Sequence, residues 1–166
     1  MQASDSSHCV QKASRNEIMT RKQASNYLSL FGVALLALPP LKAETLSVSV
    51  SHQTVAPNST IICAVFDREQ DFLDTPIKSL KINAAVSGVT EFSIELTPNK
   101  GYALSLYLDI NDNGKLDTSF LGIPSEPVGT SNNATAKFGP PSYEDAEFNV
   151  EEGTDSYQSI TLANVF

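Results

Sequence analysis

The sequence has few of the residues that build catalytic and metal centres. Of its two cysteines and two histidines, only Cys63 and His52 lie after residue 43. A single cysteine cannot form a disulfide within that part of the chain, and its apolar neighbours predict a buried, inert thiol. A single histidine and the lack of a Gly-x-Ser-x-Gly motif argue against a catalytic triad, and zinc would lack ligands. We therefore expect no catalytic residues and no enzyme activity.

Positive charge is also scarce. The chain has 11 Lys and Arg against 19 Asp and Glu, and five of the basic residues precede residue 44. So acidic a surface repels phosphate backbones and anionic lipids, which argues against a nucleic-acid partner. We expect a monomer whose partner is a cation, a protein or a small ligand.

Long apolar runs are missing as well. The longest, residues 27–38, follows Arg21 and Lys22 and precedes Ala43. A run of about 12 residues is too short for a membrane span, which needs about 20, and the order of segments is typical of a signal peptide. The alternative is a core helix. We predict a leader over residues 1–43, with Met19 as a plausible true start, and a single domain over residues 44–166. The mature protein would be periplasmic or secreted, with no membrane insertion.

The rest of the chain is rich in short β-patterned segments. Alternating or continuously apolar stretches, separated by Gly, Pro and charged turns, indicate strands at residues 46–52, 60–66, 77–86, 89–96, 102–108, 146–150 and 159–163. No segment shows a convincing helical period. The pattern predicts an all-β domain, a seven-stranded immunoglobulin-like or transthyretin-like β-sandwich, with a small barrel as the alternative.

Residues 109–117, which we call the acidic loop, carry the most specific motif. Oxygen-bearing side chains stand at relative positions 1, 3, 5 and 9, with Gly at position 6, and Lys115 would offer its backbone carbonyl. This spacing is typical of calcium loops, because Ca²⁺ takes six to eight oxygen ligands. The predicted ligands are Asp109, Asn111, Asn113, Lys115, Asp117 and Glu126.

Two features of the acidic loop leave other interpretations open. Position 12 is Phe120, where a helical calcium loop has a bidentate Glu, so this is not an intact EF-hand. Asn113 and Gly114 also suit a plain hairpin turn. A third reading uses the carboxylates of Asp109 and Glu126 for glycoside hydrolysis. The long loop at residues 122–145 is either a ligand-binding loop or a proline-stiffened surface loop.

Several blocks of the chain resemble the family called domain of unknown function 2141. They are residues 102–103, 109–117, 122–126, 129, 131–133, 138–141 and 145–148. The resemblance implies a small exported bacterial protein with an immunoglobulin-like or transthyretin-like sandwich and no established activity. The chain departs from the family pattern at Asp112, at residues 127–128 and at Thr130, and the last two changes weaken the case for an aromatic ligand contact.

Together these features favour an exported, non-catalytic binding module of unknown ligand, stabilised by calcium in the acidic loop. The alternatives are a structural or protein-interaction sandwich without metal and a small carboxylate-based hydrolase.

Overall fold

The computed structural model describes residues 42–165, which belong to one compact unit, Pro40–Phe166. The predicted leader lies almost entirely outside the described residues. The strands are β1 (Glu44–Ser51), β2 (Thr60–Phe66), β3 (Lys78–Asn83), β4 (Val89–Leu96), β5 (Lys100–Asp109), β6 (Val128–Thr130), β7 (Phe148–Val150) and β8 (Ser156–Thr161). Short helices are the 3-10 turns η1 (Glu69–Asp71) and η2 (Ser131–Asn133) and the single α-turn α1 (Tyr143–Ala146). None of the described helices has the length and apolarity to cross a membrane.

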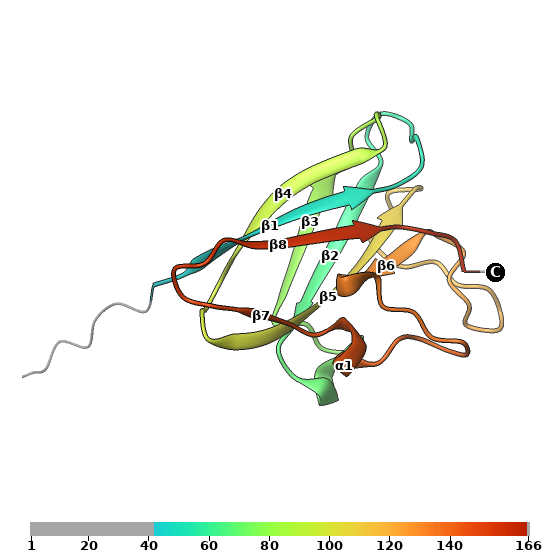
Figure 1. The fold of residues 1–166 in the computed structure, drawn as a ribbon. Helices are drawn as coiled ribbons and strands as arrows, with labels where there is room; N and C mark the ends of the chain where they lie inside the picture. Colours follow the sequence, from blue (N-terminus) through green and yellow to red (C-terminus); the bar gives the residue numbers. More distant parts are fainter. Residues whose placement is uncertain (1–41, 166) are drawn as a thin grey trace, which may run out of the picture. The chain divides into compact units, whose positions relative to one another are not determined.

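The strands form two sheets, so the all-β prediction is confirmed (Figure 1). One sheet has the order β4-β1-β8, and the other has the order β3-β2-β5-β6, with β7 also paired to β5. All neighbours are antiparallel except β1 and β8, which run parallel. The first and last strands of the unit therefore lie side by side.

The described residues contain eight strands where the sequence predicted seven. β6 lies inside the predicted long loop, and it has only three residues, too few to show an alternating pattern. Residues 143–146, the start of which was assigned to the long loop, form α1, and Ser142 caps it by accepting a hydrogen bond from Asp145 N.

Both sheets contribute to one hydrophobic core. β5 shows why: Leu104, Leu106 and Leu108 are fully buried on its inner face, in one cluster with Val48 of β1 and Ile160 of β8. The alternation of β5 turns its odd-numbered residues to the outer face of its sheet. The strand ends on that face at Asp109, so the fold places the first residue of the acidic loop at the end of its most buried strand.

A smaller cluster covers part of this outer face. Phe66 and Ala103 of the larger sheet pack against Tyr143 and Ala146 of α1. The buried hydroxyl of Ser131 links β5 to α1, because it accepts a hydrogen bond from Leu104 N at 2.9 Å and donates one to Ala146 O at 2.5 Å.

Cys63 lies on the inner face of β2 and is fully buried, as predicted. Burial raises the pKa of its thiol to about 12, so the thiolate required for alkylation is scarce at pH 8. In a Cys9→Ala variant, where Cys63 is the remaining cysteine, we expect no modification by iodoacetamide at pH 8 within an hour and full modification in guanidinium chloride. Mass spectrometry measures both, and rapid labelling of the native protein would contradict the buried position.

Candidate functional site

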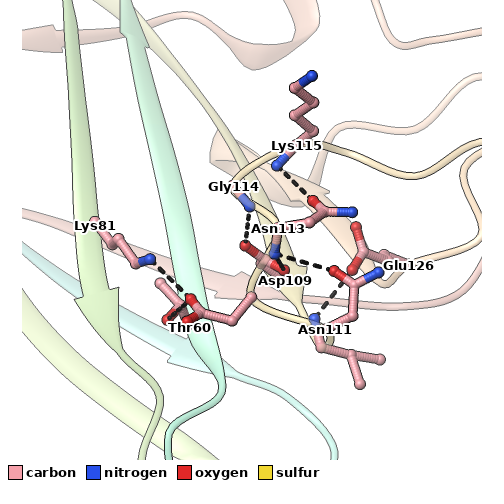
Figure 2. A network of polar contacts seen from close by, with 10 residues as sticks. Thr60, Lys81, Asp109, Asn111, Asn113, Gly114, Lys115 and Glu126 are labelled. Atoms are coloured by element: carbon pink, nitrogen blue, oxygen red, sulfur yellow. Dashed lines mark hydrogen bonds and ion pairs between the residues drawn. The ribbon is translucent and has the colours of Figure 1, made fainter.

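Asp109 closes the acidic loop. Its side chain is buried, and its carboxylate accepts hydrogen bonds from two backbone N–H groups, Asn113 N at 3.1 Å and Gly114 N at 2.8 Å (Figure 2). Gly114 takes the left-handed conformation that the turn requires, with φ of 74°. The turn therefore folds back onto the carboxylate at the end of β5.

The other predicted ligands in the loop contact one another. The carboxylate of Asp117 accepts hydrogen bonds from the side-chain amides of Asn111, at 2.6 Å, and Asn113, at 3.0 and 3.1 Å. Asn111 Oδ1 also accepts from Asn113 N at 3.1 Å. Three oxygen-bearing side chains thus converge on one point of the loop. The amide nitrogens face that point, and rotating either amide by 180° would bring its oxygen there and break the hydrogen bond that this oxygen accepts from Asn113 N or Lys115 N.

Lys115 contributes its backbone. Its N–H donates to Asn113 Oδ1 at 2.8 Å, and its side chain points away from the network (Figure 2). The ammonium group therefore does not occupy the point where the other side chains meet.

Glu126 holds the two ends of the acidic loop together. It is buried, with Oε1 accepting from Ile110 N at 3.0 Å and Oε2 from Asp117 N at 3.1 Å. The next residue, Pro127, accepts a hydrogen bond from Leu108 N at 2.9 Å. The carboxylate predicted to complete a calcium shell therefore also serves as a clamp between the loop and the segment that leads to β6.

Asp112 faces a different neighbour. Its carboxylate forms an exposed ion pair with Lys81 of β3 at 2.8 Å and accepts a weaker hydrogen bond from Thr60. The hydrogen bond from Lys81 lowers the pKa of Asp112. Asp112 is therefore the one acidic residue of the loop that a lysine neutralises directly, which makes it a suitable control position.

The remaining carboxylates leave a negative field at the loop. Tyr107 lies one strand alternation before Asp109, and its pKa is raised by burial first and then by the charges of Asp109, Glu126 and Asp117. A site that disfavours a further negative charge favours a cation.

Beyond Asp117 the chain forms a short apolar hairpin, residues 117–125. Ser125 N donates to Asp117 O and Ser119 N to Ile123 O, at 2.9 and 2.8 Å. At its tip, Phe120 is 96% exposed and Leu121 is 68% exposed. Neighbouring exposed apolar side chains such as these form a contiguous surface of the kind that can contact a partner. Asp117 belongs to both the acidic loop and the hairpin, so a change in the position of Asp117 would move both segments.

The structure thus brings the side chains of Asn111, Asn113 and Asp117 together, whereas Asp109, Glu126 and Lys115 join the same network through backbone N–H groups. Within residues 42–165, no three His, Cys, Asp or Glu side chains are grouped to hold a metal ion, so a calcium shell here would depend on the amide oxygens of Asn111 and Asn113. The one histidine of the described residues, His52, forms a hydrogen bond with Thr90 of β4 and is not part of the acidic loop. No sequence pattern pointed to Tyr107, Lys81 or Thr60, because their position beside the loop depends on strand register.

Comparison with known families finds one match. A family model described as an uncharacterized protein conserved in bacteria, DUF2141, matches residues 48–158, from β1 to β8. The chain belongs to the DUF2141 family. The match includes the whole acidic loop, Glu126 and the apolar hairpin. Searches of curated proteins and of solved structures found no match.

Proposed function

We propose that this DUF2141 protein is an exported, non-catalytic binding module whose acidic loop holds a calcium ion. The observation that carries the proposal is the convergence of Asn111, Asn113 and Asp117 beside the buried carboxylate of Asp109. Calcium prefers such carboxylate and amide oxygens, and the field around Tyr107 favours a cation. Export is supported by the leader-like order of residues 21–43.

In this proposal the ion fixes the surface that meets the ligand. Asp117 and Glu126 connect the acidic loop to the apolar hairpin, so a bound ion would order the tip that presents Phe120 and Leu121. An exposed aromatic residue above a polar rim is a typical protein-binding anchor.

The strand order of the two sheets argues against the constant-type immunoglobulin sandwich, which leaves the transthyretin-like sandwich as the proposed fold. In the constant-type immunoglobulin order the first two strands share a sheet. Here β1 and β2 lie in different sheets, with β1 between β4 and β8.

Thermal unfolding tests the calcium site. We expect the midpoint of the full-length protein to rise by about 4 °C when free calcium is ten times the Kd, because binding to the folded state then adds about 1.4 kcal/mol. Magnesium at the same concentration should give a smaller shift, since it demands a tighter octahedral shell. The measurement compares EDTA, calcium and magnesium in differential scanning calorimetry.

Two variants locate the effect. Asp117→Ala should lose the calcium shift, because it removes a proposed carboxylate ligand. The fold should remain, because the Asp117 side chain contacts only the two asparagine amides. Asp112→Ala removes the same charge from the same loop and should keep the shift, because its side chain pairs with Lys81. A wild-type shift that survives in Asp117→Ala would place the ion elsewhere.

A purely structural sandwich without metal is the second candidate. It is favoured by the protein's own hydrogen bonds, since Asp109 and Glu126 each already accept two backbone N–H groups. An unchanged wild-type midpoint in calcium would support it. The same bonds speak against the hydrolase reading, which would need activity on glycosides or esters that disappears in Glu126→Gln.

A further inference from the structure

The outer strands of the two sheets differ in how they are protected against pairing with another chain. Open edges are usually blocked by charged residues or by very short strands. β3 carries Lys78 and Lys81, β4 carries Glu91 and Glu95, and β6 has three residues. β8 is an edge strand of six residues, Ser-Tyr-Gln-Ser-Ile-Thr, with no charge and no proline.

The backbone of β8 alternates between its neighbour and the open side. Leu162 N donates to Ser51 O, so the even-numbered residues face β1. The odd-numbered residues face away from β1, and Ala163 pairs there with Val128 of β6. The open side of β8 therefore belongs to Tyr157, Ser159 and Thr161.

Asn133 fills one position on this open side. Its amide donates to Ser159 O and accepts from Thr161 N, both at 2.8 Å. These are the two bonds that one residue of a parallel strand would make. The next position along β8 consists of Tyr157 O and Ser159 N, and no hydrogen bond to either group on this side is found within the described residues. Asn133 therefore imitates one residue of a parallel strand at Ser159 and Thr161, and the backbone groups at Tyr157 and Ser159 beside it stay open in the described part of the chain.

A shallow cavity of about 200 Å³ adjoins the unfilled part of the edge. Its lining residues come from β7, from β8 and from the loop at residues 151–155. Figure 1 shows this loop connecting the two strands. Phe148 and the 62% exposed ring of Tyr157 supply apolar lining, and Glu151 and Asp155 supply negative charge. Nothing basic lines the cavity.

We propose that the β8 edge binds an extended peptide segment with basic side chains, which adds to the three-stranded sheet as a strand parallel to β8. Main-chain hydrogen bonds to Tyr157 and Ser159 supply the pairing, and Glu151 and Asp155 select lysine or arginine. This site is separate from the acidic loop and needs no calcium.

Three synthetic octapeptides test the proposal by fluorescence anisotropy with the full-length protein. An alternating Lys-Val peptide is expected to bind at least tenfold more tightly than an alternating Glu-Val peptide, because of the acidic lining. It should also exceed an alternating Lys-Pro peptide tenfold, because the latter has the same charge but lacks half of the N–H donors a strand requires. Equal binding of the Lys-Val and Lys-Pro peptides would overturn strand addition.

Protein variants place the site. Glu151→Lys combined with Asp155→Lys should weaken Lys-Val binding at least tenfold, whereas Glu91→Lys combined with Glu95→Lys, the same charge change on the β4 edge, should leave it within twofold. Binding should persist in EDTA and in Asp117→Ala, so failure of the calcium proposal and failure of this one are distinguishable. If sedimentation instead shows peptide-free dimers that Tyr157→Lys dissociates, a second copy of the chain occupies the edge and the peptide proposal is wrong.

Discussion

Replacing Asp109 with Ala is expected to lower the free energy of unfolding by about 2–3 kcal/mol at pH 7, even with EDTA present. The carboxylate is buried at the end of β5 and accepts hydrogen bonds from Asn113 N and Gly114 N. Ala would leave the Gly114 N–H without its acceptor, whereas Asn113 N keeps a second acceptor in Asn111 Oδ1. Urea unfolding followed by circular dichroism measures the loss.

Asp112→Ala is the matched control for this prediction. It removes a carboxylate three residues away, but its ion pair with Lys81 is exposed on both sides, so the variant should unfold at nearly the same urea concentration as the wild type. Asp109→Asn should fall between the two, because one oxygen remains to accept a single N–H. If Asp109→Ala and Asp112→Ala unfolded at the same urea concentration, Asp109 would not close the loop.

This prediction separates folding from ion binding. Asp109 positions the turn that carries Asn111 and Asn113, so its loss disturbs the loop with or without calcium. Asp117 has no such backbone role through its side chain, and its replacement tests the ion alone. The acidic loop thus contains one residue whose effect on stability is large in EDTA and one whose effect should appear only in calcium.

The sequence predicted the longer strands with a clear alternating or continuous apolar pattern well. β2 and β4 have the predicted bounds, and β5 extends the predicted segment by two residues at its start and one at its end. These strands are long enough for their buried faces to leave a pattern. β8 begins three residues earlier than predicted, because Tyr157 is exposed at an open edge, where burial no longer dictates an apolar residue.

The candidate ligands were predicted from a local pattern, whereas their arrangement was not. The spacing of oxygen-bearing side chains singled out Asp109, Asn111, Asn113 and Asp117, and Lys115 and Glu126 were added to complete the predicted shell. The two bonds of Glu126 and the strand-like bonds of Asn133 join segments that are distant along the chain, and no local pattern encodes them. No local pattern explains the glycine at position 129 either. An added Cβ there would lie 2.8 Å from Thr161 O and would force β6 away from β8.

Leu106→Ala is expected to be the most destabilising of the substitutions considered, with a loss of about 3–4 kcal/mol in the free energy of unfolding. Leu106 is fully buried at the middle of β5, opposite Cys63 of β2 on one side and Gly129 of β6 on the other. Removing three side-chain carbons there costs transfer energy and leaves a cavity between sheets that cannot fully collapse.

Leu121→Ala deletes the same atoms from the tip of the apolar hairpin, where the side chain is 68% exposed, and should change stability by less than about 0.5 kcal/mol. Urea unfolding of both variants in EDTA makes the comparison, and near-equal losses would mean that the hairpin tip is packed rather than displayed. The expected contrast assigns the two leucines to different tasks. The inner face of β5 holds the sheets together and fixes where Asp109 begins the acidic loop, while Leu121 contributes apolar surface that folding does not use and that remains available to a partner.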